Sequence, residues 1–325
     1  MGNGTERIER RVKLHDLRVL MSVVERGSMA KAAESLATSQ PAVSRAIADL
    51  ENSLGVRLLD RGPRGILPTP YGHALLKRAV TVFDELRMSV QDLEFLADPT
   101  AGEVWIGAST PYAAGFVTAV IDGLARRHPR VVCHLMVTER ANLHALEQRE
   151  VDLVITPVLT PITADHLHVE LLFADPLFVL AAKTNPWSRR RSIKLGDLMN
   201  EPWTLSPPGG PGGAVVTDIF RAAGLDRPAA TVVSTSGVAR IALVAKGRFL
   251  TITGESLFRF AGRDMAIKVL PVDLRTSALP VAIITLNNRT LTPVAQLFID
   301  CAREVAKRWR RANPSRHNAG KLERP

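Results

Sequence analysis

One short segment of this 325-residue chain carries side chains suited to hydrogen bonding with nucleic-acid bases. Gln40, Ser44 and Arg45 lie close together, and Ser39 and Pro41 stand beside them at the start of a predicted helix. A glutamine can pair bidentately with adenine and an arginine with guanine, while short hydroxyls near a helix N-terminus reach phosphates. These residue types at this spacing favour readout of the DNA major groove. The alternative is a helical bundle whose outer face is merely solvated.

Three predicted helices position these side chains. The first runs from Leu14 to Arg26, where apolar residues recur at steps of three and four. Ser28 is the expected cap of the second helix, and Ser39 is the expected cap of the third. Pro41 is tolerated in the first turn of the third helix, because the amide it lacks has no partner there. The apolar stripe of this third helix consists of Val43, Ile47 and Leu50.

A basic turn follows the third helix. The segments Val56 to Leu59 and Ile66 to Leu67 are each expected to form a short strand, and the turn between them carries Arg61 and Arg64. An arginine held on a narrow two-stranded wing can enter the minor groove or contact the phosphate backbone. The three helices and this wing therefore favour a small DNA-reading head over a plain bundle.

The order of these residues resembles the DNA-binding head of the LysR-type transcriptional regulators. The resemblance is carried by Gly27-Ser28, Ala32-Ala33, Leu36, Ser39 to Ser44, Leu50-Glu51, Leu54-Gly55, Arg61 and Thr69 to Gly72. Leu20 and Leu59 stand where the family usually has Phe, and Pro68 before Thr69 is a third departure, expected to stiffen the end of the wing. The resemblance implies sequence-specific DNA binding. The residues to which we assign DNA contact are Ser28, Ser39, Gln40, Pro41, Ser44, Arg45, Arg61, Arg64 and Thr69.

A long helix is predicted to follow the head, over residues 73–98. Its apolar residues recur in alternating steps of three and four, which is typical of a coiled-coil seam. The seam residues that we expect to pair two chains are Leu76, Ala79, Phe83, Leu86, Val90 and Leu93. The alternative is a helix packed on its own body, because a seam of this length is marginal alone. The family resemblance implies a linker helix that pairs two heads, and assembly into tetramers.

Beyond Gly102 short apolar strands alternate with helices, which predicts an α/β body. The resemblance implies a two-lobed, periplasmic-binding-protein-like effector domain, with the chain crossing between lobes near Thr160 to Phe173 and near Leu270 to Leu279. The fold class is therefore mixed: an N-terminal all-α winged helix-turn-helix, a long linker helix and a C-terminal α/β domain of two lobes. The expected ranges are 1–13 for a flexible start, 14–72 for the head, 73–98 for the linker, 102–163 and 275–309 for lobe I, 164–274 for lobe II, and 310–325 for a basic disordered tail.

Polar residues follow several of the predicted strands. Ligands of open α/β sheets bind at the carboxyl ends of strands, where helix N-termini offer unpaired amides. The residues expected to bind a small-molecule effector there are Ser109, Thr110, Asn142, Thr156, Ser206, Thr235 and Ser236. Taken singly, each is also an ordinary helix cap. The stretch from Trp203 into the loop Pro207 to Gly213 resembles the subgroup that includes the galactose-binding-protein and protocatechuate regulators, but it does not identify the effector.

The charge of the chain is segregated. The formal net charge is +10 with a pI of about 10.2, and it divides into +5 through Arg78, +6 from Arg303 onward and a nearly neutral middle. Basic ends on a neutral body favour a polyanionic partner, because neutralised phosphates release counterions. The expected partners are double-stranded promoter DNA, a second copy of the chain and RNA polymerase.

The sequence offers little support for catalysis. Its histidines form no metal-binding motif, and the glycines of Pro207 to Gly213 lack the lysine of a phosphate cradle. Cys133 and Cys301 are expected to be small buried hydrophobes. The start of the chain and its longest apolar runs resemble neither a secretory signal nor a membrane span, so a cytoplasmic protein is expected. We expect no enzyme activity, no metal and no cofactor besides an effector; the rival function is a ligand-independent architectural DNA-binding protein.

Overall fold

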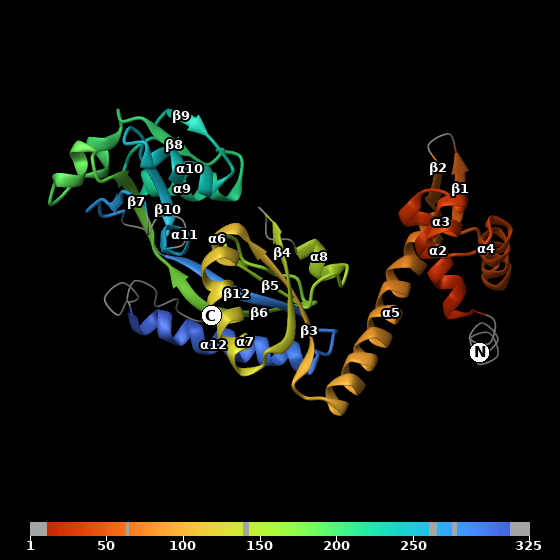
Figure 1. The fold of residues 1–325 in the computed structure, drawn as a ribbon. Coiled ribbons are helices and arrows are strands. Elements are labelled where there is room, and N and C mark those ends of the chain that lie inside the picture. The colour runs from red at the N-terminus through yellow and green to blue at the C-terminus, as the bar shows by residue number, and fades with distance from the viewer. Residues whose placement is uncertain (1–11, 63–64, 139–142, 260–264, 275–277, 313–325) are drawn as a thin grey trace. The chain divides into compact units, whose positions relative to one another are not determined.

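The computed structural model describes residues 12–62, 65–138, 143–259, 265–274 and 278–312. The chain divides into two compact units, residues 1–90 and residues 91–325 (Figure 1).

The first unit is a bundle of three helices with a two-stranded wing. The helices are α2 (Leu14–Arg26), α3 (Met29–Ser35) and α4 (Gln40–Leu54). Ser39 caps α4 as predicted, since its Oγ accepts a hydrogen bond from the amide of Ala42 at 3.4 Å. The prediction for Ser28 was only half right. It occupies the N-cap position of α3, but its hydroxyl forms no capping bond.

The wing is tied to the third helix by one carboxylate. Strand β1 (Leu59–Gly62) pairs antiparallel with β2 (Gly65–Pro68). Glu51 of α4 accepts hydrogen bonds from the amides of Leu58 at 2.7 Å and of Leu59 at 3.2 Å. A rotation of the wing away from α4 would break both charge-assisted bonds, so Glu51 fixes the wing against the helix.

The long helix α5 (Pro70–Ala97) begins directly at the wing. A Cβ atom on Gly72 would lie 2.1 Å from the carbonyl oxygen of Leu58, so only glycine fits in this first turn. The amide of Gly72 donates to Oγ1 of Thr69 at 3.1 Å, and this hydroxyl donates to the carbonyl of Arg57 at 2.8 Å. Thr69 and Gly72, three residues apart, thus join the start of α5 to the wing.

Lobe I of the second unit is a five-stranded mixed sheet between helices. Its strands, in spatial order, are β4 (Arg130–Thr138), β3 (Ala101–Ser109), β5 (Leu153–Pro157), β12 (Leu279–Leu286) and β6 (Leu167–Asp175). The first three are parallel, and the last two join antiparallel. The flanking helices are α6 (Thr110–Tyr112), α7 (Thr118–Arg127), α8 (Leu143–Glu147) and α12 (Pro293–Ala312). A short π-helical turn, Ala113–Val117, joins α6 to α7.

Lobe II contains two smaller sheets around the buried side chain of Trp203. One sheet has the order β10 (Thr251–Gly254), β7 (Leu177–Ala182) and β11 (Ile267–Val269), and the other pairs β8 (Trp203–Leu205) with β9 (Ala230–Val233). Its helices are α9 (Pro211–Ala222), α10 (Gly237–Ala245), α11 (Glu255–Leu257) and the 3-10 turns Pro186–Arg189 and Leu195–Leu198. The end of the predicted Pro/Gly loop is thus already helical.

The first crossing between lobes lies later than predicted. Residues 167–175 were placed in lobe II or in the crossing itself, yet they form β6, which pairs with β12 over eight residues at the edge of the lobe I sheet. The chain passes into lobe II only at Pro176. An edge strand is stabilised by distant pairing, which periodicity along the chain does not reveal.

A buried ion pair locks three strands of lobe I together. Arg289 donates to Oδ1 of Asp152 at 2.8 Å, and the two side chains are 1% and 3% exposed. Asp152 also accepts the amide of Trp105 in β3 at 2.8 Å, while Arg289 donates to the carbonyl of Val151 at 2.8 Å. Arg289 follows β12, Asp152 precedes β5, and Trp105 lies in the middle of β3, so the pair connects these three strands.

We predict that Arg289→Met lowers the free energy of unfolding of the second unit by about 3–5 kcal/mol, because it leaves a buried carboxylate uncompensated. Asp152→Asn in the same chain should recover part of this loss. All four tryptophans lie beyond residue 100, so tryptophan fluorescence during urea unfolding reports on this unit alone. The control is Arg221→Met, which removes an exposed pair with Asp218 and should cost at most about 1 kcal/mol. Equal losses for the two variants would contradict the assignment.

Candidate nucleic-acid interface and ligand site

The two faces of α4 differ sharply in burial. Val43, Ala46, Ile47 and Leu50 are all at most 8% exposed and form the core of the head. On the opposite side Gln40, Pro41 and Arg45 are exposed and Ser44 is half-buried. The predicted contact residues of this helix therefore share its free face, at its N-terminal end, where the positive end of the helix dipole favours phosphate.

Two further hydroxyls lie at helix starts in the same unit. Ser39 is exposed and engaged in capping α4, and the half-buried Ser28 begins α3 with its hydroxyl uncommitted to a cap. Both positions bring backbone amides of a first helical turn to the surface. Ser28 and Ser39 are thus arranged for contacts to phosphate rather than to base edges.

The structure describes only part of the wing residues that were predicted to contact DNA. Arg61 lies in β1, opposite Ile66, but its side chain lies outside what the structure describes, as does the whole of Arg64. Thr69 differs from the prediction. It is 8% exposed, and its hydroxyl is engaged with the backbone of Arg57 and Gly72. A buried hydroxyl with both bonds made inside the domain positions the wing and has no free face for DNA.

The predicted dimer seam on α5 has a buried first part and an exposed second part. Its first part packs inside the head: Ala79 is buried, while Leu76 and Phe83 contact the same core. These three residues therefore pack against the head of their own chain, while the pairing of two chains stays a prediction. The remaining seam residues, Leu86, Val90 and Leu93, are 44–68% exposed. Val82 and Leu96, which lie outside the predicted seam, are also exposed, at 38% and 77%.

Two of the predicted ligand residues meet at one edge of the lobe I sheet. Ser109 ends β3 and Thr156 lies in the parallel strand β5, where Ala108 is opposite Ile155. Their side chains are 7% and 2% exposed, and among the described residues neither hydroxyl has a hydrogen-bond partner. Buried hydroxyls without partners carry a desolvation cost, so a polar ligand or water at this edge would satisfy them.

The other predicted ligand residues have different environments. Thr110 is half-buried at the start of α6, and Asn142 lies outside the described residues. In lobe II, Ser206 follows β8 and Thr235 follows the parallel strand β9. Ser236 caps α10 through a bond from the amide of Ala239 at 3.3 Å, so the ordinary capping role holds there. The structure thus forms one polar edge in each lobe.

A buried hydrogen-bond chain at the first crossing was not predicted from the sequence. Tyr112 Oη donates to Oδ2 of Asp175 at 3.1 Å, and the amide of Ser256 donates to its Oδ1 at 2.9 Å. Tyr112 belongs to lobe I and Ser256 to α11 of lobe II, so the Asp175 carboxylate connects the two lobes. A Cβ on Gly254 would lie 2.2 Å from Oδ2, which shows how tightly the carboxylate is enclosed.

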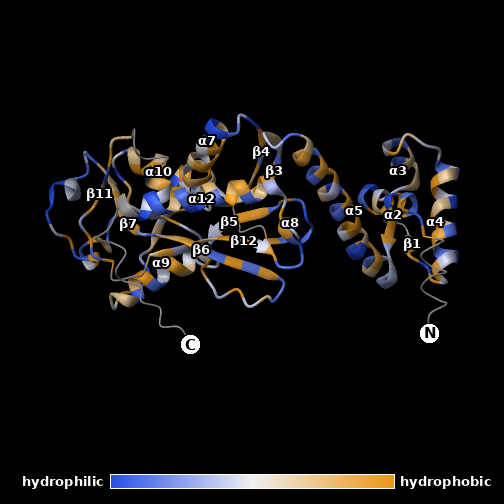
Figure 2. Ribbon diagram, turned by 90° about the horizontal axis from the view of Figure 1, so that it is seen from below, coloured by the Kyte–Doolittle hydropathy of each residue, from blue (hydrophilic) through white to orange (hydrophobic). Residues whose placement is uncertain are grey.

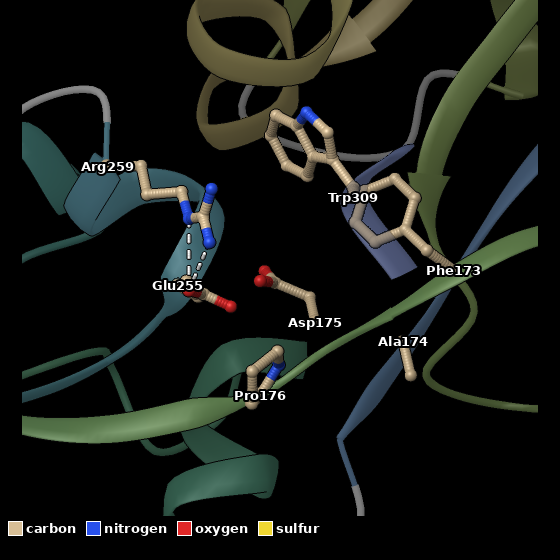
Figure 3. Close-up of a pocket in the computed structure, with 7 residues that line it drawn as sticks. All are labelled: Phe173, Ala174, Asp175, Pro176, Glu255, Arg259 and Trp309. Carbon is tan, nitrogen blue, oxygen red and sulfur yellow. Dashed lines mark hydrogen bonds and ion pairs between the residues drawn. The ribbon is translucent and has the colours of Figure 1, made fainter. Parts of the chain in front are cut away.

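A pocket opens beside the hydrogen-bonded carboxylate of Asp175 (Figure 3). Arg259 forms two hydrogen bonds to Oε1 of Glu255, at 2.8 and 3.0 Å, and its guanidinium lies 5.6 Å from the ring centre of Trp309. Phe173 contacts the same indole at a centroid distance of 5.4 Å. Arg259, two residues after α11, thus places its guanidinium over the ring of Trp309 in α12, and this cation–π contact joins the two segments beside the crossing.

Burial raises the pKa of both ionisable side chains in this hydrogen-bonded group, Asp175 and Tyr112. Loss of hydration raises the pKa of Asp175 from 3.8 to about 6. The hydrogen bonds from Ser256 and Tyr112 favour the charged form and lower the pKa, but their effect is smaller. The negative charge of Glu255 adds to the rise. The pKa of Tyr112 is raised well above its ordinary value, first by burial and then by Asp175. Asp175 therefore titrates near pH 6.

The described part of the chain contains no group of three or more His, Cys, Asp or Glu residues that could hold a metal ion. Cys301 is buried in the lobe I core as predicted, whereas Cys133 is half-buried, and burial is the main cause that raises the pKa of both thiols. Within the same residues, every helix is either too short or too polar to cross a membrane.

We predict that Asp175→Asn makes the second unit less sensitive to pH. A carboxyl whose folded pKa is raised stabilises the fold most below its unfolded value of 3.8, and this contribution is lost as pH rises through about 6. The difference in unfolding free energy should therefore shift in favour of the variant by about 3 kcal/mol from well below pH 3.8 to well above pH 6. Tryptophan-detected urea unfolding across this range measures it.

The matched control is Asp218→Asn, whose side chain is 67% exposed. It should follow the wild-type pH dependence. If Asp175→Asn also follows the wild type, Asp175 is ionised normally and the electrostatic assignment is wrong.

Two family models match the chain. The model of the bacterial regulatory helix-turn-helix proteins of the lysR family covers residues 14–73, and the LysR substrate binding domain covers residues 97–307. Among curated relatives, the HTH-type transcriptional regulator GbpR of Azospirillum brasilense is 29% identical over 92% of this chain and 88% of its own length. The transcriptional dual regulator GltC of Bacillus subtilis is 30% identical over 89% of this chain and 96% of its own length.

Solved structures agree in fold. The crystal structure of CbnR, a LysR family transcriptional regulator, has a TM-score of 0.65 at 21% identity and covers 91% of this chain and 99% of its own. Full-length CbnR in complex with its target DNA has a TM-score of 0.53 at 23% identity, covering 91% of this chain and 100% of its own. The chain belongs to the LysR family of transcriptional regulators, with a helix-turn-helix DNA-binding head and an effector-binding domain.

Proposed function

We propose that two copies of this chain, paired through α5, read two half-sites of promoter DNA, and that a small polar effector between the lobes changes how they hold it. The observation that carries the proposal is the free face of α4, where Gln40 and Arg45 are exposed while the opposite face forms the core. A cytoplasmic location, tetramer formation and contact with RNA polymerase belong to the same proposal.

The readout of bases rests on Gln40 and Arg45. Both side chains are long enough to reach base edges from a helix in the major groove, whereas Ser28, Ser39 and Ser44 are short and suit the backbone. Pro41 contributes by fixing the first turn of α4. Arg61 and Arg64 extend the contact from the wing in this proposal, while Thr69 supports the wing from inside.

Gln40→Ala and Arg45→Ala should each weaken binding to DNA selected by the wild-type chain by about 5- to 150-fold, equivalent to about 1–3 kcal/mol. Binding to random duplex should change much less, so the preference for the selected site shrinks. Fluorescence anisotropy with both duplexes measures this. Asn52→Ala, an exposed truncation at the other end of α4, is the control. A uniform loss on both duplexes would reassign Gln40 and Arg45 to phosphate contact.

Pairing of two chains rests on the exposed part of the α5 stripe. Leu86, Val90 and Leu93 continue the predicted seam, and Val82 and Leu96 extend it along the same helix. Such spacing suits a partner helix, and two linked heads gain affinity by binding one DNA.

Leu86→Glu combined with Leu93→Glu should shift the chain from dimer to monomer, because it places two charges in the apolar seam. Sedimentation velocity over a concentration series measures this. The control is Val233→Glu, at a residue of lobe II that is 53% exposed. A double variant that sediments like the wild type would exclude this stripe as the dimer interface.

The effector site rests on the unsatisfied hydroxyls of Ser109 and Thr156. The proposed ligand donates and accepts hydrogen bonds there and reaches Ser206 and Thr235 of lobe II. Thr110 begins α6, and Tyr112, which donates a hydrogen bond to Asp175, ends it. A ligand at this edge therefore contacts the helix that carries the hydrogen-bond donor to Asp175. The ligand shifts the balance of lobe arrangements only if it prefers one of them.

Metabolite screening by thermal shift tests this part. A cognate effector should stabilise the wild type, and Ser109→Ala with Thr156→Val should abolish that shift while leaving DNA affinity unchanged. Thr118→Val, which removes an exposed hydroxyl on α7, should retain the shift. A chain stabilised by DNA and by no metabolite would instead be a ligand-independent architectural protein.

A further inference from the structure

One end of lobe II carries a concentration of unpaired positive charge. The seven residues of this basic face are Lys183, Arg189, Arg190, Arg191, Lys246, Arg248 and Lys268, and all are exposed. They come from three segments: the loop after β7, the turn after α10, and β11. Figure 2 shows the hydrophilic loop beside β7 and β11.

Hydrogen bonds hold these three segments together. The amide of Lys183 donates to the carbonyl of Ala266 at 2.7 Å, and Nζ of Lys268 donates to the carbonyl of Ser188 at 2.7 Å. Asn185, which is 4% exposed, donates to the carbonyl of Gly247 at 3.3 Å. The loop is therefore fixed against both neighbours, and its cations are held near those of the other two segments.

The cations of the basic face have no acidic partners within the described part of the chain. Throughout the residues that the structure describes, none of its seven cations forms an ion pair. Exposed arginines elsewhere in the unit do pair: Arg126 with Asp122 at 2.8 Å and Arg221 with Asp218 at 2.7 Å. Unpaired cations gathered on one face repel one another and attract polyanions.

We propose that this basic face of lobe II binds the phosphate backbone of duplex DNA, as a second contact beside the helix-turn-helix head. The proposal rests on the proposed DNA-binding function, because DNA held by the head is present at high effective concentration near the rest of the chain. Exposed arginines and lysines without base-specific geometry suit backbone contact, which is independent of sequence and strongly salt-dependent. An acidic protein surface is the competing occupant.

The test compares two double variants with equal loss of charge. Arg190→Gln with Arg191→Gln removes two cations of the basic face, whereas Arg126→Gln with Arg221→Gln removes two paired cations elsewhere. Full-length protein is titrated with the selected site alone and with the same site in long random flanks, over a salt series. The basic-face variant should lose about fivefold in affinity for the flanked duplex, and its salt slope should fall by about 2. The control variant should retain both values.

Wild-type affinity and slope in the basic-face variant would overturn the proposal, and this is the result expected if the face binds an acidic protein instead. Equal losses in both double variants would also overturn it, because they would show a general effect of charge. Arg45→Ala serves as the reference for the head. If it loses site preference while the basic-face variant is unchanged, the proposed function stands and the second contact fails; the reverse pattern would leave the second contact and remove the assigned reading role of Arg45.

Discussion

The burial of one face of α4 is the constraint on which the DNA-reading surface depends. Because Val43, Ile47 and Leu50 must pack against the other helices, Gln40 and Arg45 are left on the free side. The same helix anchors the wing through Glu51, and the wing in turn receives the start of α5. Packing, wing position and the origin of the long helix thus follow from one amphipathic segment.

Local patterns predicted this head well because its determinants are close in sequence. The cap at Ser39 and the stripe from Val43 to Leu50 were confirmed, since both depend on neighbours within a few turns. The burial of Thr69 was not foreseen, because its hydroxyl bonds to the carbonyl of a residue twelve positions earlier. The free face of α4 follows from the sequence alone; the inward role of Thr69 requires the folded wing.

The second unit was less predictable for the same reason. β6 forms through pairing with a strand more than a hundred residues later. Asp175 acquires its raised pKa only when two distant segments, at Tyr112 and at Ser256, enclose its carboxylate. Average charge is similarly uninformative. The net charge of the body is nearly zero when it is summed along the sequence. Folding nevertheless brings the cations of the loop 183–191 beside those of 246–248 and 268, which are distant in sequence.

Selection of DNA from a random library with the full-length chain, followed by sequencing of the retained DNA, tests whether two paired heads read the duplex. Two paired heads must enter successive major grooves on one side of the duplex, so the retained DNA should carry two inverted half-sites whose centres are separated by about one or two helical turns. Retained sequences with a single unrepeated site, or with no shared sequence, would contradict readout by paired heads.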